Sequence, residues 1–592
     1  MKQNCDSENE YGFYFHPEDI TKTYSNLEDI SVAIFHSYHV EQALVESINR
    51  STGELLFQRR NRVKFPVGNF PSGGWRYSLH NVFEELDSPG EFYCDRKSNR
   101  LYAYTVESTE IPSFLKYTSY LSQLETLVSV VNSQNVKFSK VSFAYTSNTN
   151  VNSNRPEPIS VDIKDSKNVL IQSVGFSHMG YTGLQLYNVA NTEVKTSFFH
   201  NIGGRAITMD DRWYDYDTAS TDVLIHQNVI DYCEAKLPLW RATCIMARGR
   251  KNIKVWNNKV LNSPSSGVRA GYQYPAFQLY ERGDSIPEFV YDIRKNHVEN
   301  FGHGIINDFG AYYLSSGKAA LCHQGVSGLC EVRAKLEMNI AKNGKPFDYG
   351  GVLGYTDSGA GSIHFVKNLG IQMGPKPTLA FHCGMNNKFI NNVVNAEDVT
   401  AIVGGCTRLT SAADSLFTLE IKKNIFDVHA NCDSFDYFRP VDYVSPRTGS
   451  YKDTSGYTRW NDVQDNIYHF TNSECQPFHN NRDGVKNIGD WRNKYQFDLN
   501  SLNQTQVVPS FQRSKTRTKK EDWGTRTFRF NPREFQGKRL SRFGTDVTGV
   551  KISGIRWRGH GFNCRNQRQL PTNVWTTLNR GGTTPDVRCE TI

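Results

Sequence analysis

The sequence lacks a Cys-x-x-Cys pair, a long apolar run and a hydrophobic start. Its 12 cysteines are too widely spaced for a common type of structural zinc site, so we expect no metal and no cofactor. No apolar stretch is long enough to cross a bilayer, which argues against a membrane partner. The first five residues carry no signal region. Hydrophobic residues still make up 38% of the chain, and the mean hydropathy of -0.55 is lean but compatible with a globular protein.

The cysteine count gives an expectation about the compartment. An even number of cysteines is typical of disulfide-bonded secreted proteins, and glycosylation sequons begin at Asn49 and Asn503. We therefore expect an extracellular glycoprotein with disulfides, whose signal peptide is not part of this chain. The alternative is an intracellular protein with scattered buried thiols, because cysteine is also a common small core residue.

The positive charge lies in one part of the chain. The formal net charge is +8, but residues 511–592 hold 18 Lys and Arg against 6 Asp and Glu. A basic segment favours an anionic partner, either an acidic glycan or a nucleic acid. A solvated surface or tail is the alternative interpretation.

Composition favours a β protein with many tight corners. The chain has 35 Phe, 30 Tyr and 9 Trp, which prefer strands, and 45 Gly, which prefer turns. Its 592 residues exceed the length of a single domain, so we expect two to four domains.

A repeat runs through the middle of the chain. Each copy has Asn or Asp, two residues, an aliphatic residue or Phe, four residues, and a further apolar residue, as in Asn168-Val-Leu-Ile-Gln-Ser-Val-Gly-Phe176. Copies begin at Asn135, Asn168, Asn191, Asp222, Asn252, Val290, Leu329 (weak), Ser362, Asn386 and Thr418. A strand-rich repeat of roughly 20 to 40 residues indicates a solenoid. Asn at a fixed corner suits both a left-handed backbone and side-chain stacking between rungs.

Second strands follow the copies and begin with glycine, as a sharp corner requires. We expect them at Gly183–Tyr187, Gly204–Met209, Gly267–Ala270 and Gly304–Ile306. Leucine-rich repeats need a Leu lattice that is missing, and propeller blades need four strands each. The unequal spacing instead predicts an all-β, right-handed parallel β-helix, whose corners tolerate loops of any length.

The repeat also defines the expected domains. Strand-like runs at 31–35 and 54–57 predict a β-rich N-terminal domain over residues 1–118. The β-helix is expected over 119–430, followed by a C-terminal cap over 431–545 and a basic tail over 546–592. A cap is needed because a bare terminal rung would expose strand edges and core.

Several stretches resemble right-handed β-helix proteins related to family 141 of the glycoside hydrolases. The resemblance covers roughly residues 12 to 540. It rests on VAIFHS (32–37), SPGEFY (88–93), DRKSNRLYAY (95–104), KNHVENFGHGIINDFGAYY (295–313), YGG (349–351), YTDSG (355–359) and FH (381–382). It implies a β-helix with a groove for extended polysaccharide, and hydrolysis of glycosidic bonds.

Two aspartates are the expected catalytic pair. Glycoside hydrolysis generally uses two carboxyl groups flanking the scissile bond. Asp308 and Asp357 fall on consecutive turns of the repeat, each expected just after a strand, and neighbouring rungs lie about 4.8 Å apart. They also match the two positions that the resemblance implies are catalytic, with Asp357 assigned as the acid. The alternative is that each aspartate only satisfies a turn.

Other residues are expected to bind the sugar. His303 and His382 could hydrogen-bond hydroxyls or tune a carboxylate, although a single histidine is often structural. Tyr272 and Tyr274 lie in a loop where their rings could stack on sugars or simply pack, and Arg269 could pair with an acidic sugar.

Departures from the family motif leave other functions open. Ser358 stands where the family has a second carboxylate, and an insert with Cys322 and Cys330 could form a disulfide-closed loop over the groove. The leading hypothesis is a secreted glycoside hydrolase acting on a polysaccharide, including an anionic one. The alternatives are a non-catalytic glycan-binding or matrix protein, and a lyase or epimerase using the acidic cluster at 210–217. Nucleic acid is the least favoured partner, because no recognised module accompanies the basic tail.

Overall fold

The structure is a computed structural model. It describes residues 11–16, 18–58, 76–88, 91–104, 122–148, 158–209, 220–234, 242–271, 288–315, 331–347, 350–357, 360–373, 379–382, 386–396, 402–405, 419–428, 461–470, 488–495, 499, 502–504, 512–513 and 528–529. Within these ranges, no helix has the length and apolar character needed to span a membrane.

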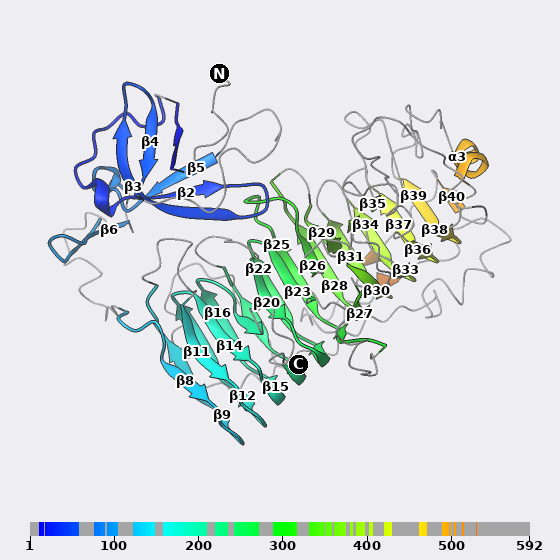
Figure 1. The fold of residues 1–592 in the computed structure, drawn as a ribbon. Helices are drawn as coiled ribbons and strands as arrows, with labels where there is room; N and C mark the ends of the chain where they lie inside the picture. Colours follow the sequence, from blue (N-terminus) through cyan, green and yellow to red (C-terminus); the bar gives the residue numbers. More distant parts are fainter. Residues whose placement is uncertain are drawn as a thin grey trace, which may run out of the picture.

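The N-terminal part is an antiparallel sheet with its own small core (Figure 1). The strands expected at 31–35 and 54–57 are confirmed as β2 and β4, and the motif at 88–104 forms the β6–β7 hairpin. In spatial order the sheet consists of β1 (Gly12–Tyr14), β4 (Glu54–Phe57), β3 (Val40–Asn49), β2 (Ser31–Phe35) and β5 (Arg76–His80). Beside it lie η1 (Leu27–Asp29), η2 (Phe83–Glu85), β6 (Phe92–Asp95) and β7 (Arg100–Ala103).

The rest of the described chain is a right-handed parallel β-helix of three sheets, as the repeat predicted (Figure 1). Sheet 1 contains β8 (Val128–Val131), β11 (Ile159–Lys164), β14 (Thr182–Tyr187), β17 (Ile207–Met209), β20 (Thr243–Ala247), β23 (Ser266–Ala270), β26 (Gly310–Ser315), β29 (Val352–Asp357), β32 (Leu379–His382) and β35 (Ile402–Gly405). Each strand pairs in parallel with the strand of the next rung.

Sheet 2 contains β9 (Lys137–Ser139), β12 (Leu170–Gln172), β15 (Ala190–Lys195), β18 (Thr221–His226), β21 (Lys251–Trp256), β24 (Tyr291–Arg294), β27 (Glu331–Glu337), β30 (Gly361–Val366), β33 (Asn387–Ile390), β36 (Leu419–Lys422) and β38 (Asn461–Gln464). Sheet 3 contains β10 (Ser142–Ala144), β13 (Gly175–Met179), β16 (Phe198–Ile202), β19 (Val229–Asp231), β22 (Lys259–Ser263), β25 (His297–Phe301), β28 (Ile340–Gly344), β31 (Leu369–Met373), β34 (Val393–Ala396), β37 (Ile425–Val428), β39 (Ile467–Phe470) and β40 (Leu502–Gln504).

The solenoid continues beyond residue 430, the boundary that the repeat suggested. Strands β38, β39 and β40 extend sheets 2 and 3 in parallel pairing. Helix α3 (Ile488–Tyr495) and the small β41–β42 pair (Gln512–Arg513 and Phe528–Arg529) are the other described elements after residue 430. The expected tail at 546–592 lies outside the described residues.

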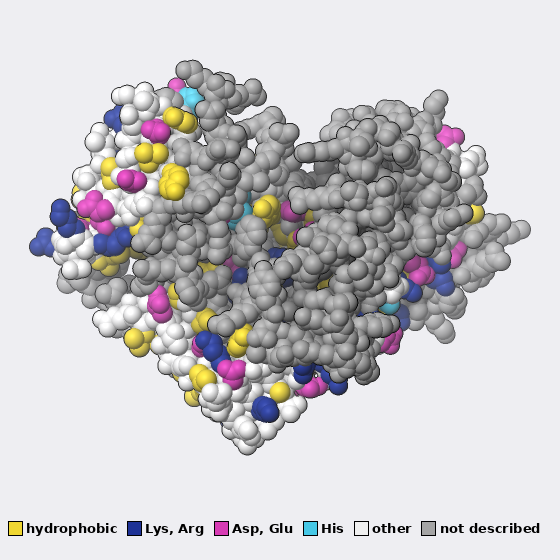
Figure 2. Space-filling model, viewed as in Figure 1, with side chains coloured by type: hydrophobic (Ala, Val, Ile, Leu, Met, Phe, Trp, Pro, Cys, Tyr) yellow, Lys and Arg dark blue, Asp and Glu magenta, His cyan; other side chains and the backbone are white. Residues whose placement is uncertain are grey.

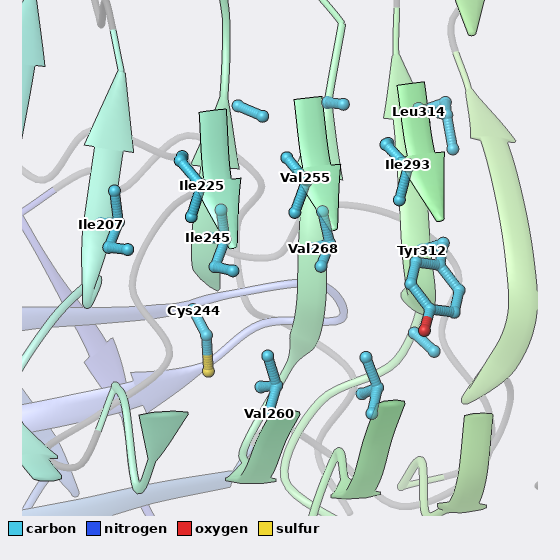
Figure 3. Packing of buried hydrophobic residues seen from close by; sticks show 14 of the residues in the cluster. Ile207, Ile225, Cys244, Ile245, Val255, Val260, Val268, Ile293, Tyr312 and Leu314 are labelled. Atoms are coloured by element: carbon cyan, nitrogen blue, oxygen red, sulfur yellow. The ribbon is translucent and has the colours of Figure 1, made fainter. Parts of the chain in front are cut away.

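The core consists of apolar side chains that stack rung on rung (Figure 3). Ile245, Val268 and Tyr312 occupy equivalent positions of β20, β23 and β26. Alternate residues of a strand point to opposite faces, so one face of every short strand enters this core. The rows continue from rung to rung, which gives each rung a buried apolar contact with the next.

The asparagine corner of the repeat is confirmed. Asn135, Asn168 and Asn191 have φ angles of 58°, 55° and 51°, in the left-handed region. The Asn168 side-chain amide donates to Asn135 Oδ1 at 3.0 Å, so the side chains do stack between rungs. The weak copy expected at Leu329 was wrong. Arg333 takes that corner instead, because β27 shifts its register by a bulge between residues 331 and 334.

A second, buried asparagine ladder lies six residues after these corners. Its members are Asn228, Asn258, Asn296, Asn339, Asn368, Asn392, Asn424 and Asn466, each at most 1% exposed. Each side-chain amide except the last donates to the carboxamide oxygen of the next member at 3.0–3.2 Å, and the amide of Asn466 donates to the carbonyl oxygen of Ile421. The ladder pairs polar groups at the corner between sheets 2 and 3, where burial without partners would be costly.

One expected strand is absent from the described chain. Residues 304–306, predicted as a glycine-led strand, belong to a turn over 302–309, and β26 begins only at Gly310. Gly302, His303, Gly304 and Asp308 all have positive φ angles there. A chain with this many left-handed residues cannot pair as a strand, and the turn carries one of the expected catalytic residues.

A disulfide bond joins Cys233, just after β19, to Cys244 in β20, across a separation of 11 residues. The expectation of disulfides is confirmed for this pair, whereas Cys322 and Cys330 lie outside the described residues.

The Cys233–Cys244 bond closes a short loop, and removing a bond across a loop of this length should lower the free energy of unfolding by about 3 kcal/mol. Urea unfolding of the wild type and of a Cys233→Ser/Cys244→Ser variant, each with and without reductant, measures it. Reductant should destabilise only the wild type by this amount; an equal effect on both would contradict the prediction.

Candidate functional site

The N-terminal sheet contacts the β-helix at its middle rungs. The β2–β3 hairpin extends over sheet 3 (Figure 1), and Ala33 and Val40 join the apolar core of the helix. At the hairpin tip, the backbone N–H of Asn307 donates to the carbonyl oxygen of Ser37 at 2.5 Å. Arg76 of β5 donates to the carbonyl oxygen of Ile305. The turn over 302–309 is therefore held from outside the solenoid.

Asp308 and Asp357 lie on neighbouring rungs, at sheet 1. Asp357 is the last residue of β29, and Asp308 lies in the turn before β26. The expectation that each aspartate lies just after a strand is not met exactly: Asp357 is still part of its strand, as the last residue, and the segment before Asp308 is a turn. Both side chains are partly buried.

A pair of stacked tyrosines binds the two carboxylates. Tyr313 and Tyr355 are in register on β26 and β29, with ring centroids 5.0 Å apart and an interplanar angle of 11°. The Tyr313 hydroxyl donates to Asp357 Oδ2 at 2.5 Å, and the Tyr355 hydroxyl donates to Asp308 Oδ1. Each ring thus contacts the carboxylate supplied by the other rung, which links the two aspartates through one aromatic pair.

The tyrosines remain protonated donors over the usual pH range. Burial raises the pKa of both phenols well above 10, and the negative charges of Asp357 and Asp308 raise them further. For Tyr313 the positive charge of Arg269 opposes this rise. A phenol that stays protonated continues to donate its hydrogen bond, so the orientation of both carboxyl groups is preserved in alkaline solution.

Arg269 extends the same row by one rung. It pairs with Tyr313 across β23 and β26, and its guanidinium carbon lies 4.3 Å from the centroid of the Tyr313 ring. Its Nη2 donates to Ser315 Oγ at 3.4 Å, while its Nε is buried and has no hydrogen-bond partner among the described residues. The arrangement brings a cation next to the tyrosine pair that binds the two carboxylates.

His303 belongs to the same turn as Asp308 but points toward another partner. Its Nε2 lies 3.0 Å from the carbonyl oxygen of Asn300, and its ring centroid lies 6.2 Å from that of Tyr232. The side chain is exposed. These contacts direct the imidazole toward the end of β19. His303 is therefore not grouped with the carboxylates of Asp308 and Asp357.

Three other expected residues are only partly placed or lie outside the description. His382 is the last residue of β32, one rung after Asp357, and its backbone position continues the register of β29 with β32. Its side chain is not among those described. Tyr272 and Tyr274 lie outside the described residues, as does the acidic cluster at 210–217.

Sequence reasoning missed the tyrosine pair. Tyr313 and Tyr355 are the fourth residues of their strands, so they occupy the same place on consecutive rungs. The signal in the sequence was an aromatic residue close to each expected catalytic aspartate: Tyr355 is two residues before Asp357, and Tyr313 is five after Asp308. Only the strand register shows that the two hydroxyls cross to the opposite aspartates.

Side chains of different kinds are visible where the hairpin meets the helix. On the face shown in Figure 2, hydrophobic, acidic, basic and histidine side chains of described residues lie near one another in the middle of the view. In the same view of Figure 1, this place corresponds to the tip of the β2–β3 hairpin. Charged groups therefore reach the surface close to the contact that holds the turn before β26.

No family model matches the chain, and no curated protein matches its sequence. Several solved structures are similar to parts of it, among them a hydrolase, a tailspike and an adhesin. A glycoside hydrolase is 15% identical, over 64% of this chain and 72% of the other, with a TM-score of 0.45. A variant tailspike protein of E. coli bacteriophage HK620, in complex with a pentasaccharide, is 11% identical, over 59% and 56%, with a TM-score of 0.39. PfbA, a surface adhesin of Streptococcus pneumoniae, is 14% identical, over 55% and 74%, with a TM-score of 0.34. The alignment spans less than two thirds of the tailspike, and at these values none of the three carries a function to this chain.

Proposed function

We propose that the chain is a glycoside hydrolase that cleaves a polysaccharide at the Asp308–Asp357 pair. The observation that carries the proposal is the crossed arrangement of two carboxylates and two tyrosine hydroxyls on neighbouring rungs. Hydrolysis of a glycosidic bond needs two carboxyl groups placed on either side of the reacting carbon. The motifs at 295–313 and 355–359, which resemble β-helix glycoside hydrolases, add support from the sequence.

Each residue then has a distinct part in the reaction. Asp357 protonates the leaving-group oxygen, and Asp308 acts on the opposite side of the sugar as base or nucleophile. Tyr313 and Tyr355 are positioning residues, because their hydroxyls orient the two carboxyl groups without exchanging protons themselves. Arg269 lies beside the pair and favours a substrate with an anionic or strongly polar substituent.

The site also suits an extended polymer and an extracellular setting. Parallel strands stacked rung on rung give sheet 1 a long outer face, which matches a chain of sugars better than one small molecule. The Cys233–Cys244 disulfide supports an oxidising compartment, because such bonds are rare in the cytosol. We therefore place the substrate outside the cell.

A glycan-panel assay tests the proposal. Fucosylated, xylan-type, sulfated and uronic polymers are incubated with the full-length wild type and with the Asp308→Asn/Asp357→Asn variant. We expect the wild type to release reducing ends from at least one polymer and the double variant to release none. The anomer formed first, followed by NMR, then distinguishes retention from inversion.

Two other results would replace the proposal. Products with an unsaturated uronate ring, detected by their ultraviolet absorbance, would show that the protein is a lyase. A polymer that both proteins bind equally and neither cleaves would make it a glycan-binding protein. Binding measured by affinity electrophoresis on the same panel separates these two results.

A further inference from the structure

A separate polar cluster lies at the tip of the β2–β3 hairpin. His36, His39 and Glu41 are 4%, 0% and 3% exposed. A carboxylate and two imidazoles buried together are unusual, because burial of polar and charged groups is costly unless their charges and hydrogen bonds are compensated. The cluster is distinct from the Asp308–Asp357 pair and has no part in the proposed hydrolysis.

The hairpin places the three side chains on one face. The backbone N–H of His36 donates to the carbonyl oxygen of His39 at 2.9 Å, so these residues face each other across the turn Ser37-Tyr38. Glu41 lies two residues after His39, and side chains two apart on a strand share a face. Residues Ala33 and Val40, on the other face, pack into the core of the solenoid.

Their ligating atoms lie close together. One nitrogen of each histidine and one carboxylate oxygen all lie within 4.8 Å of one another. His39 Nε2 is 3.3 Å from Glu41 Oε1, and His36 Nε2 is 3.9 Å from Glu41 Oε2. Donor atoms of a tetrahedral zinc site lie about 3.3 Å apart, so the His39–Glu41 pair already has this spacing. The imidazole rings of His36 and His39 are stacked, with centroids 4.5 Å apart, so the His36 ring has to rotate to direct its nitrogen at the same ion.

We propose that His36, His39 and Glu41 bind one Zn²⁺ ion. Two imidazoles and one carboxylate are a common three-ligand set for zinc, with the fourth position left to water or another group. The ion would add a positive charge beside the buried Glu41 carboxylate.

The position of the site gives the ion a structural role. The turn residue Ser37, between the two histidines, accepts the hydrogen bond from the N–H of Asn307. Asn307 directly precedes Asp308. An ion that fixes the hairpin tip therefore also fixes the anchor of the turn over 302–309. Zinc binding itself does not depend on the proposed hydrolase activity.

Zinc binding to the full-length protein tests the inference. We measure the metal content after dialysis, the affinity for Zn²⁺ by competition with a chromophoric chelator, and the visible spectrum after loading with Co²⁺. The variants are His39→Gln and Glu41→Gln. The matched control is His226→Gln, which removes a histidine–carboxylate pair, with Glu193 at 2.8 Å, elsewhere on the solenoid.

We expect one equivalent of Zn²⁺ in the wild type and in the control. Both hairpin variants should bind it at least about 100-fold more weakly and lose the intense Co²⁺ bands of a four-coordinate site. EDTA should lower the Tm of the wild type and of the control only. The inference is overturned if the wild type binds no zinc, or if the hairpin variants bind it as tightly as the wild type.

A measurement on the wild type alone covers the case in which a variant does not fold. X-ray absorption at the zinc edge should show nitrogen and oxygen ligands near 2.0–2.2 Å, including the scattering pattern of two imidazoles. Sulfur ligands, or a shell made only of water, would place the ion elsewhere and overturn the assignment.

From the sequence alone we expected that no metal is bound. That expectation rested on the missing cysteine pairs, whereas the relevant signal is the spacing His-x-x-His-x-Glu over 36–41. This spacing indicates a metal site only when a two-residue turn brings the two histidines face to face. The strand bounds of β2 and β3 establish that turn.

Discussion

Replacing Asp357 by asparagine should lower kcat on the best polymer of the panel by about 10³-fold while leaving KM within a few-fold. The amide keeps the size of the side chain and can still accept the hydrogen bond from Tyr313, but it cannot deliver the proton that the leaving group needs. Asp308→Asn should have a loss of similar size, because an amide is neither a base nor a nucleophile. Steady-state kinetics at several polymer concentrations separates the two constants.

Two further variants make this prediction specific. Tyr355→Phe removes the hydroxyl that orients Asp308 and should cost activity by only about 10- to 100-fold, as expected for a positioning residue. Asp292→Asn, on the outside of β24 where Asp292 pairs with Arg294, should change kcat less than twofold. A kcat for Asp357→Asn within tenfold of the wild type would remove Asp357 from the catalytic pair.

The largest loss of stability is expected from Asn296→Ala. Asn296 donates to the carbonyl oxygen of Val255 at 2.7 Å and to Asn339 Oδ1 at 3.0 Å. It also accepts from the backbone and side chain of Asn258 at 2.9 and 3.0 Å. Alanine leaves several buried polar groups without partners, and each such group costs about 1–3 kcal/mol. We expect the free energy of unfolding to fall by about 3–5 kcal/mol, measured by urea denaturation.

An exposed asparagine provides the matched control. Asn300 also stacks with asparagines of neighbouring rungs, Asn262 and Asn343, but it is exposed and has a φ angle of 56°. Asn300→Gly keeps this backbone conformation and gives up only hydrogen bonds that water can replace, so a loss below about 1 kcal/mol is expected. Equal losses of unfolding free energy for Asn296→Ala and Asn300→Gly would mean that burial does not increase the contribution of the inner ladder to stability.

Local sequence patterns were sufficient to predict most strands and corners of the solenoid. The repeat located the strands of sheets 2 and 3 and their left-handed corner, because apolar alternation and Asn preference depend on residues close in sequence. The same patterns predicted β2 and β4 in the N-terminal sheet. The copy near Leu329 was misplaced, because the bulge in β27 breaks the spacing on which the prediction depends.

The site was predictable only in part. The repeat and the family motifs together brought Asp308 and Asp357 to neighbouring rungs, and Arg269 to the same sheet. The crossed hydrogen bonds of Tyr313 and Tyr355 depend on the register between strands that are 42 residues apart. The contact of Ser37 with Asn307 depends on how two domains pack, and no pattern within either segment encodes it.

That contact also sets an order of events during synthesis. The N-terminal sheet leaves the ribosome before the turn that it holds: Ile305, whose carbonyl oxygen accepts the hydrogen bond from Arg76 of β5, comes 229 residues after Arg76. At typical translation speeds this delay is on the order of tens of seconds. Early rungs can stack on one another during this interval, since each pairs only with its neighbours. The turn that carries Asp308 reaches its final conformation only when a part of the chain that was made earlier docks onto one that is made much later.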